Sequence, residues 1–234
     1  RLYWLLILTA SDLSSIGMAV LSADFVPALR FQALTRFYDP VVRLTTRERR
    51  VKKILIEAAG VPAGGTVLDL GCGTGTMTRW VKQHHPDARV IGLDADPRIL
   101  AIAREKATRA GVEIEFLEAN ATDIPLQENS VQRVLSSLFF HHLLPDSRAQ
   151  VLTEVFRILE ADGELHISDW GKPSNGLMRA MFLFVQLLDG FACTKDNVAG
   201  RLPDFVKAAG SRQVQNYDAY NTVLGTLRLL RAIK

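Results

Sequence analysis

The chain contains the stretch Val67-Leu68-Asp69-Leu70-Gly71-Cys72-Gly73-Thr74-Gly75, around which the rest of its sequence can be organised. Its first part is a short apolar run, Val67, Leu68 and Leu70, which is typical of a strand buried on both faces. Glycine then recurs at every second position, and glycine tolerates positive φ and lets a ligand lie directly against the backbone. A helix is expected from Thr76, with its N-terminal N–H groups facing the same turn. The stretch therefore predicts a strand, a ligand-binding turn and a helix.

Several kinds of site compete for this turn. A phosphate loop needs Gly-Lys followed by Ser or Thr, which is absent here. A dinucleotide site prefers G-x-G-x-x-G, but the position of its third glycine is occupied by Thr76. Asp69 precedes the glycines, and a carboxylate there repels a pyrophosphate but suits a ligand with an ammonium or sulfonium charge. On this stretch alone, an ordinary glycine turn in an α/β protein remains an open alternative.

A second apolar segment, Ala88–Leu93, reads as another strand and ends at Asp94. This acid follows the last glycine by about 20 residues, the spacing expected for a carboxylate that binds a ribose. One carboxylate can accept hydrogen bonds from both hydroxyls of a ribose. Asp94 could instead cap the helix that begins near Pro97, but Asp96 fits that role better. We therefore expect Asp94 to bind a ribose.

With an acid before the turn, the stretch resembles motif I of the class I S-adenosylmethionine-dependent methyltransferases. Further segments resemble later motifs of this family in the same order: Glu118–Leu126, Val134–Leu143 and Phe156–Leu165. The resemblance covers about residues 31–231 and is closest to the group that includes the ubiquinone and menaquinone biosynthesis methyltransferases. It implies S-adenosylmethionine as cofactor, S-adenosylhomocysteine as product, and methyl transfer to a small molecule.

The expected fold is α/β: a Rossmann-like, doubly wound, seven-stranded sheet, mostly parallel with an antiparallel last strand, plus N-terminal helices. Strand and helix patterns alternate from Thr66, as in a parallel sheet covered on both faces. Strands are expected near 66–70, 89–93, 113–117, 132–136 and 163–168, helices near 75–84, 97–110, 147–159 and 201–209, and a final hairpin over 214–220 and 222–230.

Composition limits the class of protein. The chain has 234 residues, 48% of them apolar and 23% charged, which is ordinary for a globular protein of one domain or one domain with an appendage. A net charge of +3 is too small to indicate nucleic acid. The two cysteines, Cys72 and Cys193, fit no metal spacing, so we expect reduced thiols, a cytoplasmic location and no metal.

We expect three regions along the chain. Residues 1–24 form an extension whose apolar start, Arg1–Ala10, is too short to span a membrane; it could be a secretory signal, but upstream sequence before a natural start at Met18, or a simple helix, is favoured. Residues 25–60 form a helical cap. Residues 61–234 form the methyltransferase domain, with an apolar helical insertion at 172–200.

The resemblance implies a set of cofactor-binding residues: Tyr38, Asp69, Gly71, Cys72, Gly73, Gly75, Asp94, Ala95, Asn120, Ala121 and Ser137. Asn120 stands where the family usually has aspartate, which accepts a hydrogen bond from the adenine amino group. The asparagine carbonyl can do the same, and Asp123 is an alternative acceptor. Tyr38 resembles a family tyrosine that lies over the cofactor, although plain core packing explains it equally well.

The pair His141-His142 invites a metal or general-base interpretation. Adjacent positions of an extended strand point to opposite faces, and no cysteine or carboxylate is close by in sequence, which argues against a metal. Histidine titrates near neutrality, so His142 is a candidate base or substrate-orienting residue, and Tyr38 is a second catalytic candidate. A structural role for both histidines stays open.

Two further segments bear on partners. A helix from Thr45 or Thr46 to Ala59 carries Arg47, Arg49, Arg50, Lys52 and Lys53, either as a solvated face or as a surface attracted to an anionic membrane. Residues 177–191 are apolar nearly all round the helix, so we expect them to be buried. They could line an acceptor pocket, form a dimer contact or lie on a membrane.

The predicted function is methyl transfer to a small apolar or amphipathic acceptor, such as a quinone-like phenol or a lipid. No basic stripe interleaved with aromatics indicates nucleic acid. We expect a monomer or homodimer, with a peripheral membrane contact as an open possibility. The alternatives are an NAD-dependent Rossmann oxidoreductase and a non-catalytic methyltransferase-like binding domain.

Overall fold

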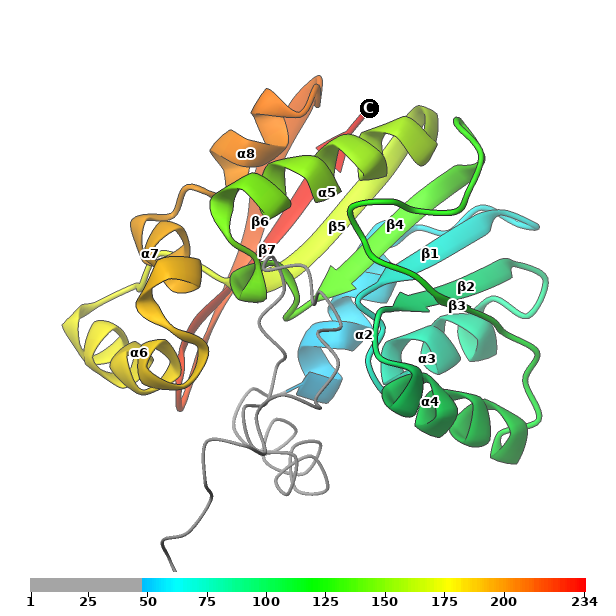
Figure 1. Cartoon of the computed structure of the whole chain (residues 1–234), viewed down its shortest axis with the longest axis horizontal. Helices are drawn as coiled ribbons and strands as arrows, with labels where there is room; N and C mark the ends of the chain where they lie inside the picture. Colours follow the sequence, from blue (N-terminus) through cyan, green and yellow to red (C-terminus); the bar gives the residue numbers. More distant parts are fainter. Residues whose placement is uncertain (1–47) are drawn as a thin grey trace, which may run out of the picture.

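A computed structural model describes residues 48–234 of the protein (Figure 1). Its strands are β1 (Thr66–Leu70), β2 (Arg89–Asp94), β3 (Glu115–Glu118), β4 (Val131–Ser137), β5 (Leu159–Trp170), β6 (Gln213–Thr222) and β7 (Gly225–Ile233). Its helices are α2 (Glu48–Ala59), α3 (Thr76–His84), α4 (Pro97–Arg109), α5 (Pro145–Ile158), α6 (Gly176–Asp189), α7 (Phe191–Ala199) and α8 (Leu202–Ala208), with a 3-10 turn, η2 (Phe140–His142).

The seven strands form one sheet in the order β3-β2-β1-β4-β5-β7-β6. Strands β1 to β5 pair in parallel, whereas β7 runs antiparallel to both β5 and β6. The chain order reverses direction across the sheet between β1 and β4, and open α/β sheets bind ligands outside the carboxyl ends of the strands at such a point. The expected doubly wound sheet with a reversed last strand is confirmed.

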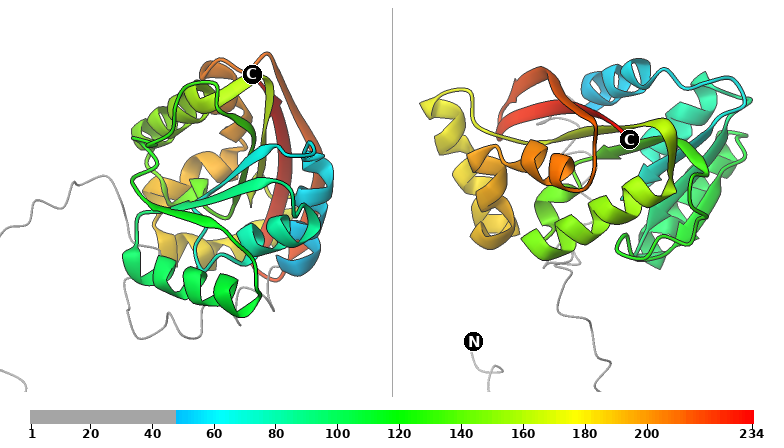
Figure 2. Two further views of the ribbon diagram at one scale, coloured as in Figure 1. Left: turned by 90° about the vertical axis from the view of Figure 1, so that its right-hand side faces the viewer. Right: turned by 90° about the horizontal axis from the view of Figure 1, so that it is seen from above.

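The sheet separates two apolar cores, one on each face (Figure 2). Helices α5 and α8 cover one face, and α2, α3 and α6 contribute to the core on the other. Buried residues of β1 alternate between them, since Val67 packs with the second group and Leu68 with the first. Helix α2 is therefore part of the same core as the sheet.

Two element boundaries differ from the sequence-based expectation because of local backbone geometry. Helix α4 ends in a left-handed Gly111, and Val112 N–H bonds back to the Ala107 carbonyl, so β3 starts only at Glu115. Strand β5 starts already at Leu159, with a shift in its pairing to β4. Asp162, at φ 63°, lies in this bulge, so Asp162-Gly163 interrupts the strand instead of preceding it.

The expectation that 177–191 is buried was wrong for half of its surface. Met178, Phe182 and Val185 of α6 are buried against the core. The opposite face exposes five large apolar side chains, with Leu187 72% exposed. Phe182 packs edge-on against Trp170 at the end of β5, which fixes the inner face of the helix.

Several predictions fall outside the described residues. They concern the extension 1–24, the first part of the cap, Tyr38, and Arg47 with its candidate caps Thr45 and Thr46.

Candidate active site

The glycine turn follows β1 as the sequence predicted. Gly71, Gly73 and Gly75 all have positive φ, at 67°, 53° and 70°. A Cβ on Gly71 would lie 2.4 Å from the Phe139 ring, and one on Gly75 would lie 2.9 Å from Ala103 of α4. A Cβ on Gly73 would meet no atom of the described residues within 4 Å. The outer two glycines therefore allow close packing, and the middle one leaves room for a ligand against the backbone.

Asp94 lies directly against this turn. Its Oδ2 accepts a hydrogen bond from Gly73 N–H at 2.9 Å, and its Oδ1 accepts one from Asp96 N–H at 3.1 Å. The neighbouring Asp96 caps α4 by accepting from Arg98 N–H, as the sequence predicted. Burial raises the pKa of Asp94, while the two backbone hydrogen bonds favour its charged form. A carboxylate has more lone pairs than these two bonds use, so Asp94 can still accept from a ribose.

Asp69 lies behind the turn. It is 1% exposed, and its Oδ2 accepts a 2.6 Å hydrogen bond from the Thr78 hydroxyl of α3. Burial raises the pKa of Asp69 to about 6, against the effects of Thr78 and of Lys52 on α2. The carboxylate thus ties β1 to α3 and is not open to direct contact with a ligand. Cys72 is likewise buried, and burial raises the pKa of its thiol.

The expected adenine loop follows β3 and reaches back to the same edge. Ala119 N–H donates to the Asp94 carbonyl at 3.2 Å. The Asn120 side-chain oxygen accepts from Thr122 N–H at 3.1 Å, while Ala121 is buried. This bond turns the asparagine oxygen towards its own backbone, so of its two lone pairs one remains for a ligand. Ala95 is exposed beside Asp94.

Arg157 of α5 fixes the far end of this loop. Its guanidinium donates to the Leu126 carbonyl at 2.9 Å and to the Ile124 carbonyl at 2.8 Å, and it pairs with Glu154. Glu154 in turn accepts from Ile124 N–H. The sequence analysis did not identify this pair, which holds the loop from the α5 side.

A second polar group lies where β4 and β5 end. Ser137 ends β4 opposite Ser168 of β5, and Leu138 then takes a left-handed φ of 57°, which turns the chain into η2. The expectation that His141 and His142 point to opposite faces of a strand was therefore wrong. In the 3-10 turn their rings lie with centroids 3.9 Å apart.

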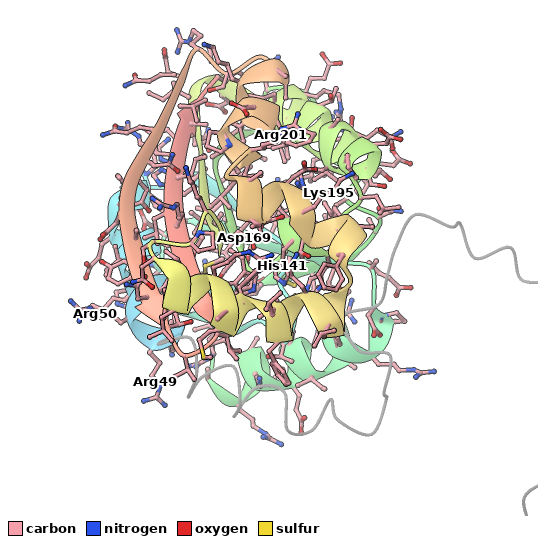
Figure 3. All side chains as sticks on the ribbon, turned by 90° about the vertical axis from the view of Figure 1, so that its left-hand side faces the viewer. Arg49, Arg50, His141, Asp169, Lys195 and Arg201 are labelled. Carbon is pink, nitrogen blue, oxygen red and sulfur yellow. The ribbon has the colours of Figure 1, made fainter. Side chains whose placement is uncertain are left out.

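His141 is bound by the carboxylate of Asp169, from β5 (Figure 3). His141 Nδ1 lies 2.7 Å from Asp169 Oδ1, and its backbone N–H donates to Oδ2 at 3.2 Å. A carboxylate acceptor places the proton on Nδ1, so Nε2 is the basic nitrogen. Burial and the neighbouring His141 lower the pKa of His142 well below its usual range. The carboxylate partner thus points to His141 rather than to His142 as the better-supported base.

Comparisons with known proteins identify the kind of domain. Residues 67–163 match a family profile described as a methyltransferase domain. The crystal structure of an S-adenosylmethionine-dependent methyltransferase from Aquifex aeolicus superposes with a TM-score of 0.59, over 82% of this chain and 91% of that chain, at 21% identity. A demethylmenaquinone methyltransferase from Thermus thermophilus is 32% identical over 148 residues, which cover 62% of this chain and 66% of that protein. The chain contains a methyltransferase domain of the class I S-adenosylmethionine-dependent type.

This methyltransferase has relatives with different acceptors. An erythromycin 3''-O-methyltransferase from Saccharopolyspora erythraea is 36% identical over 118 residues, which cover 49% of this chain and 38% of that protein. The matched part of the chain thus spans less than two thirds of either curated relative. S-adenosylmethionine is the cofactor of the family, and the open space at Gly73 beside the Asp94 carboxylate fits a ribose-bearing ligand.

Arg148 of α5 supports the 3-10 turn η2, which contains His141 and His142. The sequence analysis did not identify this arginine. Its side chain is fully buried. Nη2 donates to the Phe140 carbonyl at 3.0 Å and to the Cys193 carbonyl at 2.9 Å, and Nη1 lies 3.7 Å from Asp196. One guanidinium therefore joins η2 to α7. A buried arginine looks like any helix cation in sequence, so only the fold identifies it.

A cavity of about 330 Å³ opens on the other side of Asp169. It lies between the end of β5, strands β6 and β7, and helices α7 and α8, and its polar lining includes Lys172, Asn197, Asn216 and Arg228. No residue of 177–191 lines this cavity. The apolar wall expected from that segment is therefore not part of it.

Residues 48–234 contain no group of three or more His, Cys, Asp or Glu side chains placed to hold a metal ion. None of the helices in this part of the chain is long and apolar enough to cross a bilayer.

Proposed function

We propose that the protein transfers the methyl group of S-adenosylmethionine to a small-molecule acceptor, with His141 as the proton acceptor. The observation that carries the proposal is the contact between Asp94 and Gly73, which places a carboxylate able to accept from ribose hydroxyls beside a glycine with room for a ligand. When bound, the cofactor supplies a methyl group already activated by a sulfonium. The NAD-dependent oxidoreductase and the non-catalytic domain are not favoured, since the family comparison and the acid before the turn both fit methyl transfer.

In this proposal the residues of the β1–β2 edge hold the cofactor. Asp94 accepts from the ribose hydroxyls, the backbone of residues 71–75 lies against the ligand, and Asp69 acts from behind by fixing α3. Ala95, Asn120 and Ala121 contact the adenine, and the backbone at Ser137 contacts the methionine part. Tyr38 keeps its proposed place over the cofactor, although it lies outside the described residues.

The β4–β5 edge handles the proton. An acceptor oxygen or carbon that takes the methyl group from the sulfonium sulfur, with S-adenosylhomocysteine as the leaving group, would lose a proton, and His141 Nε2 would take up that proton. Asp169 then faces an imidazolium, whose charge its carboxylate stabilises at a 2.7 Å hydrogen bond. His141 and Asp169 are both buried, so they act with water largely excluded.

The acceptor is proposed to be a small apolar or amphipathic molecule. The relatives are named for demethylmenaquinone and for the 3''-oxygen of erythromycin, and both of these are small molecules. We further propose a cytoplasmic enzyme that is a monomer or homodimer. The different acceptors of the two relatives leave the methylated atom to experiment.

The test is methyl transfer from S-adenosylmethionine with a labelled methyl group into a fractionated cell extract. We expect label in the organic-solvent fraction, and clearly less of it from an Asp94→Ala variant assayed beside the parent at a low cofactor concentration. Label that enters only RNA or protein would contradict the small-molecule proposal. Oxidation of NADH by the protein in the presence of extract, without methyl transfer, would favour the NAD-dependent oxidoreductase instead.

A further inference from the structure

The outer face of α6 exposes an apolar stripe that the fold does not explain. Leu177, Met181, Phe184 and Leu187 recur every three or four residues, so they lie on one side of the helix. They are strongly exposed, with Leu177 at 64% and Phe184 at 56%. An exposed patch of this kind on a soluble protein marks an interaction site more often than a chance surface.

The stripe continues onto two neighbouring elements. Phe191, at the start of α7, is exposed at one end of it. At the other side lies the tip of the β6–β7 hairpin, because the Phe182 ring packs within 2.9 Å of where a Cβ on Gly225 would be, and Val223 at this tip is exposed. We call the outer face of α6 with Phe191 and Val223 the apolar end face.

Basic side chains lie near two sides of the apolar end face. Arg50 of α2 lies over the Tyr220 ring, 5.8 Å from its centroid, next to the hairpin tip. Figure 3 looks onto this end, with Arg49 and Arg50 below the start of α6 and Lys195 on the upper side of the neighbouring helix α7. Residues 172–201 contain four basic and two acidic residues, and one of the acids, Asp196, is buried against Arg148 and Arg201. Arg201 pairs with this acid, and the other charges of the segment still sum to a net positive charge. We call Arg49, Arg50 and Lys195 the basic rim of the apolar end face.

A second copy of the chain fits this surface poorly. A two-fold dimer contact would place the same basic rim on both sides, so like charges would face one another. Helix α6 has 14 residues, which makes it about 21 Å long. A stripe of that length and about 10 Å width offers far less than the ~800 Å² per partner of a standard interface.

The N-terminal residues of the same chain are also disfavoured by charge. Residues 1–47 have a net positive charge, with five basic residues, Arg1, Arg30, Arg36, Arg43 and Arg47, against three acidic ones, Asp12, Asp24 and Asp39. They carry the same sign of charge as the rim. An anionic lipid surface has the opposite charge, and the apolar stripe can enter the boundary between headgroups and acyl chains.

We propose that the apolar end face docks on the surface of an anionic lipid bilayer, with the outer side chains of α6 in the interface and the basic rim over the headgroups. This surface lies at the end of the molecule that carries His141 and Asp169. An acceptor dissolved in the membrane would thus meet the protein at its acceptor side. The docking is independent of whether methyl transfer occurs.

The test is co-sedimentation of the full chain with vesicles, without methyl donor or acceptor. The anionic vesicles consist of phosphatidylcholine with about 30% phosphatidylglycerol. Vesicles of pure phosphatidylcholine serve as the neutral control. We expect binding to the anionic vesicles that weakens with salt. The double variant Phe184→Ser and Leu187→Ser should bind at least about tenfold more weakly, and Arg49→Gln with Arg50→Gln about 5-fold more weakly per charge.

Matched controls keep the test specific. Ile102→Ser removes an exposed apolar side chain from α4, and Lys207→Gln removes an exposed charge from α8; neither residue belongs to the apolar end face. Both controls should bind like the parent. Because methyl transfer is measured separately, loss of docking and loss of catalysis can be told apart.

Three results would overturn the proposal. One is equal binding by the Phe184/Leu187 variant and the parent. Another is a halved mass of that variant in light scattering, which would assign the face to a second copy. The last is strong hydrogen-exchange protection of the outer side of α6 in vesicle-free protein together with no vesicle binding, which would assign it to residues of the same chain.

Discussion

The two polar edges of this methyltransferase differ in how their residues come together. At the β1–β2 edge, Asp94 meets a turn that lies one strand and one helix earlier, and the partners sit at a fixed spacing along the chain. At the β4–β5 edge, His141 meets Asp169, which is 28 residues away, through a left-handed Leu138 and a 3-10 turn. The residues of the first edge can be recognised from their types and their spacing along the chain. The pairing at the second edge depends on tertiary packing.

The largest expected effect comes from a substitution that disrupts the β4–β5 edge and leaves the β1–β2 edge intact. Asp169→Asn keeps the shape of the side chain but removes the negative charge that favours a protonated His141. We expect methyl transfer to fall by about 10²–10⁴-fold, with S-adenosylhomocysteine binding kept. His141→Gln should behave alike. A steady-state assay with calorimetry on the same samples measures both, and full activity in Asp169→Asn would rule out the proton role.

Removal of Arg148 should weaken the same edge through folding. Arg148→Met fills similar volume but leaves Asp196 and the carbonyls of η2 and α7 without the guanidinium. Arg201 still pairs with Asp196, so the loss comes mainly from the buried carbonyls left without a donor, at about 1–3 kcal/mol each. Urea unfolding should show this loss of free energy, whereas Arg98→Met on the exposed start of α4 should change it by less than about 0.5 kcal/mol. Similar losses of unfolding free energy in both variants would contradict the role of Arg148 in joining η2 to α7.

The sequence predicted the first edge well because its signals are local. Glycine positions, the acid after β2 and the Asp96 cap all depend on backbone conformations that neighbouring residues set. It predicted the second edge poorly, since nothing near His141 indicates which strand end supplies its acid. It was also silent on Arg148 and on Lys52, whose charge lowers the pKa of Asp69 from another element. The sequence analysis did not predict that one face of α6 is exposed, because an apolar helix pattern predicts burial but does not show which surface covers each face.

A pH effect sharpens the account of Asp69 at the first edge. Burial raises its pKa from 3.8 to about 6, so the folded state binds this proton more tightly than the unfolded chain. Stability from this group is therefore present below about pH 4 and lost as the pH rises to about 6, in total about 3 kcal/mol. Asp69→Asn still accepts from Thr78 and lacks this titration. Its unfolding free energy relative to the parent should rise between about pH 4 and 7, and a difference that stays constant would count against burial as the cause.

Two glycine substitutions separate packing from ligand space at the same turn. Gly71→Ala forces a Cβ into the Phe139 ring at a φ of 67°, and should lower the unfolding free energy by about 1–3 kcal/mol. Gly73→Ala meets no described atom within 4 Å, so only backbone strain of about 1 kcal/mol is expected. Thermal unfolding and calorimetry should thus show the larger stability loss for Gly71→Ala and a clear loss of cofactor affinity for Gly73→Ala. The reverse pattern would contradict the assignment of the open side.

The central claim, that Asp94 and the glycine turn bind S-adenosylmethionine, is tested most directly by calorimetry with S-adenosylhomocysteine. The parent protein should bind it, and Asp94→Ala should bind about tenfold or more weakly, a loss of at least ~1.4 kcal/mol for bonds to a charged acceptor. Asp96→Ala, which removes only the cap of α4, should bind like the parent. Unchanged affinity in a folded Asp94→Ala variant, or a parent that binds NADH but not S-adenosylhomocysteine, would contradict the claim.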